Sequence, residues 1–319
     1  MEPVLYLGVA CSSSYNNNRF LHPETQNTQD MENDRHSVSS TGDYPPLHHM
    51  LRDLLISAEF QEKTRCVVRA PVVPQICTDR GGVHVGVVAT LVDVLGASLA
   101  IRAIYPDWIA TAGLSIYMTR PATSGTIVAS GSVIRAGQSI NVIDVDINEE
   151  LSGSTHPGTS IGSAIMTFSR LPRRKDTIEV EADSVNGINF ALEQSGLFRR
   201  YLDEVGLRIL DETAGVIEIK MTDYVRNSFG AIQGGIVALL ADVAGQCAAR
   251  AATGQPLITK DITVHYLSQG RVGPFRTRAR MLRKTSDTAL TRVEVVDIGA
   301  NDRLLMVGMN TATRDYNSV

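Results

Sequence analysis

Two long, almost uninterrupted apolar stretches dominate the pattern of hydrophobic and polar positions. They are GGVHVGVVATLVDVLG (81–96) and GAIQGGIVALLADVAG (230–245), and each holds a single acid, Asp93 or Asp242. A helix that is apolar nearly all round must be covered on most sides by the rest of the fold. The pattern therefore predicts two buried helices, at about 86–103 and 235–252.

The two stretches are copies of one another. Each position of the later stretch lies 149 residues after its counterpart, as Gly235 follows Gly86, and eight of the sixteen positions are identical. The identical pairs are Gly81/Gly230, Gly86/Gly235, Val88/Val237, Ala89/Ala238, Leu91/Leu240, Asp93/Asp242, Val94/Val243 and Gly96/Gly245. Self-similarity over this length indicates a duplicated domain.

Shorter segments around each long helix predict the remaining elements. Before the helix we expect a short amphipathic helix and one strand: 45–60 and 66–73 in the first copy, 188–206 and 215–221 in the second. After it we expect four strands: 111–118, 126–134, 140–147 and 160–170, then 258–267, 275–283, 289–298 and 303–314. Few helices among many strands predict an α+β fold in which each sheet curls around its helix.

Composition narrows the class of protein. The 319 residues suit two domains of ordinary size, and 43% hydrophobic with 20% charged residues is typical of a soluble protein. A formal net charge of −4 argues against a nucleic-acid partner and favours a small-molecule substrate. The four cysteines show neither CxxC nor zinc-ligand spacing, which indicates a reducing, cytoplasmic location. We expect no membrane span.

Two segments are too polar to bury a core. Residues 1–45 predict a disordered tail, and 173–187 predict a linker between domains at 46–172 and 188–319. Met31 and Met50 are alternative starting points. The apolar patch that ends at Cys11 resembles a lipoprotein signal but lacks its basic start.

The acid inside each helix calls for an explanation. Burying an unpaired carboxylate costs several kcal/mol, and Asp is a poor residue for a helix interior. Each Asp follows a glycine by seven residues, so it points to the side where its own loop enters the helix. Alternatively, each Asp has a purely structural role and hydrogen-bonds the backbone across the contact between the two helices.

The loop chemistry favours a functional explanation. Gly234 and Gly235 remove side chains where the second helix begins, so free amides there can approach a ligand and stabilise a developing negative charge. An oxyanion donor beside a semi-buried acid suits hydrolysis of an activated ester, with the acid as general base or nucleophile.

The complete motif in the second copy is Asn227, Gly230, Gln233, Gly234, Gly235 and Asp242. It matches N-x-x-G-x-x-[HQ]-G-G followed by an acid on the central helix, and so resembles the PaaI-like hot-dog fold thioesterases. The resemblance spans about 46–316. It implies two tandem hot-dog domains, each an antiparallel sheet wrapped around a long central helix, that form an intrachain pseudo-dimer.

The resemblance also implies roles for residues. The thioester carbonyl is expected to be held by the glycine amides at the helix start, Gly234 and Gly235, with Asn227 or Gln233. Asp93 of the facing copy is expected to drive the hydrolysis.

A second site would join Thr78, His84 and Gly86 to Asp242 and to the hydroxyl of Thr259. Thr78, His84 and Val85 replace Asn227, Gln233 and Gly234 there, and Thr259 maps to Ala110 by the same offset. We expect this second site to be weaker.

The expected function is an acyl-CoA or acyl-carrier thioesterase that needs neither a metal nor a redox cofactor and assembles as a homo-oligomer of double hot-dog chains. Two alternatives remain open. An acyl-CoA-binding or regulatory module would explain the altered first loop. An enoyl-CoA hydratase or dehydratase would need a proline-flanked His before the helix, which neither copy has.

Overall fold

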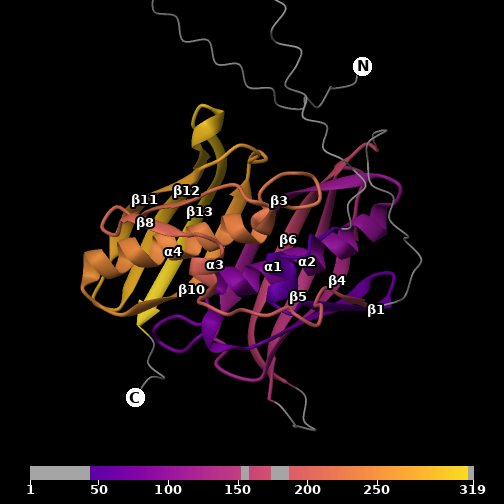
Figure 1. The fold of residues 1–319 in the computed structure, drawn as a ribbon, viewed down its shortest axis with the longest axis horizontal. Helices are drawn as coiled ribbons and strands as arrows, with labels where there is room; N and C mark the ends of the chain where they lie inside the picture. The colour runs from indigo at the N-terminus through magenta and orange to yellow at the C-terminus, as the bar shows by residue number, and fades with distance from the viewer. Residues whose placement is uncertain (1–43, 152–157, 174–186, 315–319) are drawn as a thin grey trace, which may run out of the picture. The chain divides into compact units, whose positions relative to one another are not determined.

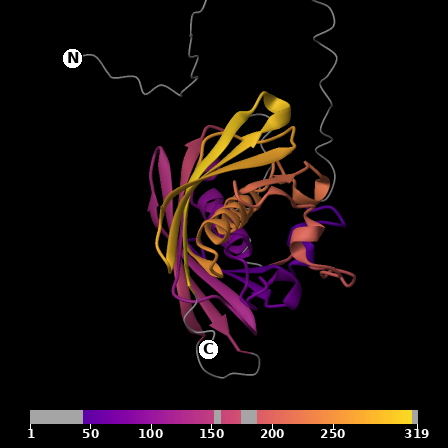
Figure 2. The same ribbon diagram turned by 90° about the vertical axis from the view of Figure 1, so that its left-hand side faces the viewer.

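The computed structural model describes residues 44–151, 158–173 and 187–314. Their strands form one sheet of 13 strands in the order β7-β1-β2-β4-β5-β6-β3-β10-β13-β12-β11-β9-β8. The sheet curves around two long helices (Figures 1 and 2). Most of the predicted tail and linker, 1–43 and 174–186, lies outside the described residues.

The first copy supplies eight helices and strands and one short 3-10 turn. They are α1 (Met50–Asp53), β1 (Ser57–Glu62), β2 (Arg65–Pro71), η1 (Pro74–Ile76), α2 (Val85–Ile104), β3 (Trp108–Met118), β4 (Thr126–Ala136), β5 (Ile140–Glu150) and β6 (Thr159–Leu171).

The second copy repeats this order. Its elements are β7 (Ile188–Asn189), α3 (Tyr201–Glu204), β8 (Arg208–Asp211), β9 (Val216–Ile219), η2 (Asp223–Val225), α4 (Gly234–Thr253), β10 (Leu257–Tyr266), β11 (Phe275–Lys284), β12 (Thr288–Asp297), η3 (Ile298–Ala300) and β13 (Arg303–Arg314).

The prediction of amphipathic helices at 45–60 and 188–206 is wrong. Only a single helical turn forms in each segment, α1 in the first and α3 in the second. Leu55 at φ 52 and Gly206 at φ 71 end these turns in the left-handed region, so the chain cannot continue as a helix. The residues beyond Leu55 form β1, which pairs with β2, and those beyond Gly206 form β8, which pairs with β9.

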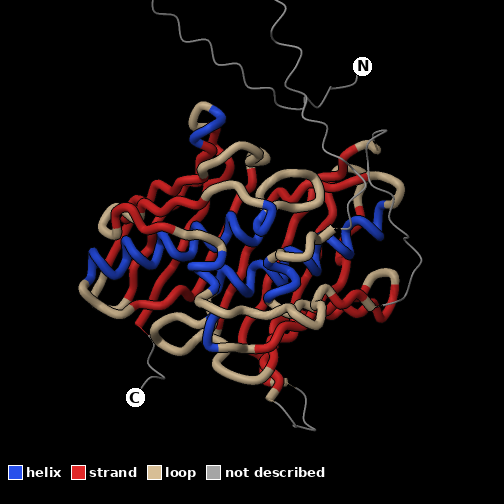
Figure 3. Tube along the Cα trace, in the orientation of Figure 1, coloured by secondary structure: helices blue, strands red, loops and turns tan. Residues whose placement is uncertain are grey.

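The two long helices and the strands that follow them were predicted to within a few residues. Figure 3 shows α2 and α4 lying across the sheet. Both helices are long and apolar enough to cross a bilayer, which the sequence analysis did not expect. The buried share of their apolar windows is 72% and 78%, so they are core helices of this fold.

The helices touch where the repeated glycines lie. A Cβ on Gly86 would approach the Leu239 Cα to 2.4 Å, and one on Gly235 would approach the Thr90 Oγ1 to 2.4 Å. Both glycines are therefore required for the close contact between α2 and α4. This contact brings the start of each helix beside the middle of the other.

The sheets of the two copies join through β3 and β10. Ser115 pairs with Thr263, and their hydroxyls are 3.3 Å apart. β3 shifts register directly after Thr111, and β10 shifts register directly after Thr259. These landmarks are 148 residues apart, so the counterpart of Thr259 is Thr111. The prediction that Thr259 maps to Ala110 is therefore wrong, because the segment between helix and strand is one residue longer in the first copy.

Candidate active site

Asp93 of α2 lies against the turn that begins α4. The carboxylate is buried, with 6% of the residue exposed. A Cβ on Gly234 would lie 2.8 Å from the Asp93 Oδ2, which places this oxygen directly over the glycine. Thr111 Oγ1 lies 3.4 Å from the other oxygen and is oriented to donate to it. We call Asp93, Thr111, Gly234, Gly235 and Tyr266 the Asp93 site.

Burial changes the acidity of this carboxyl group. Desolvation raises the pKa of Asp93 from 3.8 to about 6, because the charged form loses its water. The backbone amide of Gly235 and the Thr111 hydroxyl interact with the charged form and lower the pKa, but by less than burial raises it. Asp93 therefore remains ionised at pH 7 and has a proton affinity suited to a general base.

The start of α4 presents backbone donors to this acid. The first helical amides, those of Ile236 and Val237, both donate to the Gln233 carbonyl, at 3.0 and 3.2 Å. The N–H groups of Gly234 and Gly235 lie ahead of this ladder and point out of the helix end. With the helix dipole, they form a place where a negative oxygen is stabilised.

Tyr266 of β10 completes the Asp93 site. Its hydroxyl donates a hydrogen bond of 2.9 Å to the carbonyl of Gly234. Burial of the hydroxyl and the nearby charge of Asp93 hold the pKa of Tyr266 well above its ordinary value, so the phenol stays protonated. Tyr266 was not predicted from the sequence to be part of the site.

Asn227 shapes the loop before α4. Its Oδ1 accepts the amides of Phe229 and Ala231, at 2.9 and 3.0 Å, and its own amide donates to the Ala231 carbonyl at 2.7 Å. Gln233 is the N-cap residue of α4 and is buried, but its side chain makes no capping hydrogen bond. The side-chain oxygen of Asn227 is thus engaged within the loop.

The loop of the first copy has the same shape. Thr78 Oγ1 accepts the Arg80 amide at 3.2 Å, and the Thr78 amide donates to the Gly82 carbonyl at 2.8 Å. Gly81 and Gly230 both have positive φ angles, 80° and 72°. Such angles favour glycine, which accounts for the identity of this pair in the repeat.

Asp242 of α4 lies at the start of α2, in a different environment. It is fully buried and accepts three hydrogen bonds, from the Gly86 amide at 3.0 Å, Gln246 Nε2 at 2.8 Å and Thr259 Oγ1 at 2.5 Å. Asn310 Nδ2 donates to the same threonine oxygen at 3.0 Å. We call Asp242, His84, Gly86, Gln246 and Thr259 the Asp242 site.

His84 lies beside this acid without a direct bond to it. Its Nδ1 is 4.0 Å from the Asp242 Oδ2, and neither ring nitrogen has a hydrogen-bond partner among the described residues. Burial lowers the pKa of His84, so the ring is neutral at pH 7. A cavity of about 20 Å³ nearby, enough for about one water, is lined by residues that include Thr78, Val85 and Thr259.

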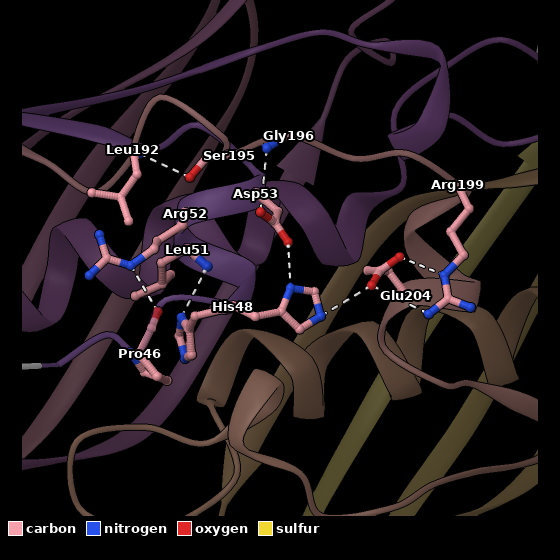
Figure 4. Close-up of polar contacts among 11 residues, drawn as sticks. Pro46, His48, Leu51, Arg52, Asp53, Leu192, Ser195, Gly196, Arg199 and Glu204 are labelled. Carbon is pink, nitrogen blue, oxygen red and sulfur yellow. Dashed lines mark hydrogen bonds and ion pairs between the residues drawn. The ribbon is translucent and has the colours of Figure 1, made fainter. Parts of the chain in front are cut away.

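The segment before α1 reaches across to the loop of the second copy. Tyr44 Oη donates to the carbonyl of Arg226 at 3.3 Å, and His49 Nε2 lies 2.9 Å from the same oxygen. Beside it, His48 lies between two carboxylates, 3.4 Å from Asp53 and 3.3 Å from Glu204 (Figure 4). These contacts from the first copy hold the loop residue Arg226, which directly precedes Asn227.

The structure brings together the loop and the acid that the sequence assigned to each site: Asp93 with Gly234 and Gly235, and Asp242 with Gly86 and Thr259. Sequence reasoning missed Thr111, because a single offset was applied throughout. It also missed Tyr266, Gln246 and Asn310. Gln246 follows Asp242 by four residues on the helix, a spacing at which side chains meet. No group of three metal-ligating side chains occurs within 44–151, 158–173 and 187–314.

The fold and the paired sites define a tandem double hot-dog protein. The sequence model of the thioesterase superfamily matches residues 80–150 and 229–301, one match in each copy. An inferred esterase of Halobacterium salinarum is 31% identical over 107 residues, which are 31% of this chain and 70% of that protein. The chain therefore belongs to the thioesterase superfamily.

Solved structures establish the same fold. A protein assigned as a thioesterase from Novosphingobium aromaticivorans has a TM-score of 0.53 and 14% identity, covering 81% of this chain and 98% of its own. An acyl-ACP thioesterase from Bacteroides thetaiotaomicron has a TM-score of 0.51 and 9% identity, covering 78% and 97%. Nearly the full length of each relative corresponds to both copies together.

Proposed function

We propose that this protein is an acyl-CoA thioesterase and that Asp93 is its general base. The observation that carries the proposal is a desolvated carboxylate, with a pKa of about 6, packed against the glycines at the start of α4. Family membership supports thioester hydrolysis in general, and this geometry supports Asp93 as the acid responsible.

In the proposed reaction, the Asp93 carboxylate takes a proton from a water molecule while the water oxygen adds to the thioester carbonyl carbon. The carbonyl oxygen becomes an oxyanion, which the amide of Gly234 and the dipole of α4 stabilise, while the Gly235 amide faces Asp93. The carbon–sulfur bond then breaks, and the proton held by Asp93 passes to the departing thiolate. The products are a carboxylic acid and a free thiol.

The Asp242 site is a poorer candidate. Three protein donors already engage both oxygens of Asp242, which leaves about one free acceptor position on the carboxylate. Val85 stands where the other loop has Gly234, and it narrows the approach to the helix end. We therefore assign hydrolysis to the Asp93 site and a structural role to Asp242.

The test is a screen of the purified full chain against short, long, branched and aromatic acyl-CoA thioesters, with free thiol detected by a chromogenic disulfide. The double variant Asp93→Asn/Asp242→Asn, purified in the same way, measures contaminating activity. We expect thiol release from at least one class above that background. Tight acyl-CoA binding without release over hours would favour the binding module instead, and water addition to an enoyl-CoA would favour the hydratase.

Acyl-carrier thioesters belong in the same screen, because a relative of this fold is an acyl-ACP thioesterase. The proposal includes a PaaI-like grouping, a cytoplasmic location and assembly of several double hot-dog chains. Size-exclusion chromatography with light scattering tests the assembly directly.

A further inference from the structure

We propose that Tyr266 is a positioning residue for Asp93, because its hydroxyl fixes and polarises the peptide group between Gly234 and Gly235. The kinetic consequences of this inference rest on the proposed function. Its structural content, a hydrogen bond that tunes the acid through one peptide, is tested separately below.

The geometry links three groups in series. The carbonyl of Gly234 and the N–H of Gly235 are the two ends of one planar peptide unit and point in opposite directions. Tyr266 Oη donates to the carbonyl end at 2.9 Å. A hydrogen bond at the oxygen draws electron density from the nitrogen, so the N–H at the far end becomes a stronger donor.

The far end of this peptide faces Asp93. The Asp93 Oδ2 lies 2.8 Å from the Cβ position of Gly234, and the Gly235 amide interacts with the ionised carboxylate. The equivalent contact in the other site is a hydrogen bond of 3.0 Å from the Gly86 amide to the Asp242 Oδ2. The direction of the amide at the start of each helix is thus the same in both copies.

Tyr266 remains a donor at every pH at which the protein would work. The titratable groups that face Asp93 from neighbouring elements are Tyr266 of β10 and Tyr44 of the segment before α1. Both have pKa values raised by burial and, to a lesser extent, by the charge of Asp93. Both stay neutral, so neither tyrosine changes its charge as Asp93 titrates.

The first copy has no tyrosine at the position equivalent to Tyr266. With the offset of 148 that relates β3 to β10, the counterpart of Tyr266 is Met118, which also lines the cavity beside the Asp242 site. A thioether cannot donate a hydrogen bond, so the peptide between Val85 and Gly86 has no equivalent donor from this position. Tyr266 therefore distinguishes the two sites.

The decisive variant is Tyr266→Phe, which removes the hydroxyl and keeps the ring. We expect kcat to fall about five- to tenfold with KM within twofold, because one neutral hydrogen bond in the site is lost. We also expect the acid limb of the pH profile to move above about 6, because a less polarised Gly235 amide stabilises the carboxylate less. Tyr117→Phe, an exposed tyrosine on β3, is the matched control.

A readout independent of activity comes from the sequence itself. Only two glycines directly follow another glycine, Gly82 and Gly235. In protein labelled with [1-¹³C,¹⁵N]glycine, an HNCO spectrum therefore contains two peaks, and the one at Gly235 reports both ends of the peptide that Tyr266 contacts. The Gly82 peak is the internal reference, and Gly234→Ala assigns the pair by removing one of them.

Titration of the Gly235 peak gives the pKa of Asp93 directly. Tyr266→Phe should move the Gly234 carbonyl signal upfield and raise the titration midpoint, while Tyr117→Phe leaves both unchanged. An unchanged peak and midpoint in Tyr266→Phe would overturn the inference, even if the wild-type protein hydrolyses thioesters. If the wild type releases no thiol from any substrate, the proposed function fails, and the titration alone decides whether Tyr266 tunes Asp93.

Discussion

Asp93 and Asp242 occupy the same position in two copies of one fold, yet their surroundings differ. Asp242 is held by Gln246 of its own helix and by a threonine that Asn310 supports. The counterpart of Gln246 in the first copy is Ala97, 149 residues earlier. The counterpart of Asn310 is Met166, because Asn310 pairs with Ile262 of β10 and Met166 pairs with the equivalent Leu114 of β3. Neither Ala97 nor Met166 can donate a side-chain hydrogen bond. A shared backbone thus creates two buried acids, and a few side chains decide which one accepts hydrogen bonds from neighbouring amide groups.

The largest expected difference between the two acids is in catalysis. Asp93→Asn should lower kcat/KM by at least about 100-fold, because the base that activates water is lost. Asp242→Asn should keep activity within about fivefold, the scale of a small structural disturbance. Steady-state kinetics on the best substrate of the screen, with circular dichroism to confirm folding, measure both. Equal losses in the two variants would show that both sites work, and the reverse order would refute the assignment.

The same pair of variants should change stability in opposite directions. The folded-state pKa of Asp93, about 6, lies above its ordinary value of 3.8, so ionisation opposes folding. This penalty is absent below pH 3.8, grows as the pH rises to 6 and is complete above it, at about 3 kcal/mol for a shift of this size. Asp93→Asn should therefore stabilise the protein by up to that amount at pH 7.5.

Asp242→Asn should instead destabilise by about 2 kcal/mol, because the amide cannot accept hydrogen bonds from all three donors. Urea unfolding at pH 7.5 measures both free energies, and a repeat at pH 4.5 should reduce the gain for Asp93→Asn to about 1 kcal/mol. A loss of stability in both variants at pH 7.5 would mean that Asp93 is also a satisfied structural acid.

The pH dependence of kcat/KM provides the next test. The general base must be ionised, so activity should fall as the pH drops through about 6, the pKa of Asp93. Asp242→Asn should show the same limb as the wild type, since that acid takes no part. Rates between pH 4.5 and 8, at constant ionic strength, define the limb. If the acid limb of the profile disappeared in Asp242→Asn, the general base would be Asp242 and not Asp93.

The smallest effects should come from the two threonines. Thr111→Val removes a hydroxyl 3.4 Å from Asp93, and we expect at most a twofold to threefold loss of kcat. Thr259→Val removes a donor at 2.5 Å that also accepts from Asn310, so about 1–2 kcal/mol of stability should be lost with little change in rate. Measuring rate and unfolding for both variants separates the roles, and a rate loss confined to Thr259→Val would contradict the comparison.

Much of this arrangement follows from the sequence. The apolar runs predicted α2 and α4, alternation predicted the strands after them, and the family resemblance placed Asp93 opposite Gly234. The differences between the sites were harder to predict because the copies do not share one offset. Counterparts are 149 residues apart in the long helices but 148 apart in β3 and β10, so Thr259 was paired with Ala110 instead of Thr111.

The remaining contacts depend on packing between distant elements. Asn310 reaches Thr259 from a neighbouring strand, 51 positions along the chain. Tyr266 reaches the start of α4 from 32 positions away. Neither contact follows from hydrophobic periodicity, which locates elements without specifying which polar side chains meet. The lengths of α1 and α3 were overestimated for a related reason. The left-handed backbone conformations at Leu55 and Gly206 end each helix, although the amphipathic pattern continues.

Joining β3 to β10 within one polypeptide has a consequence for how such a molecule can change. In an assembly of two identical chains, every substitution appears twice, and a harmful change at one centre is matched at the other. Here the two halves are encoded separately, so a mutation changes only one of the two sites. One half can therefore acquire amide side chains that stabilise the fold, while the other keeps an acid that is available for catalysis.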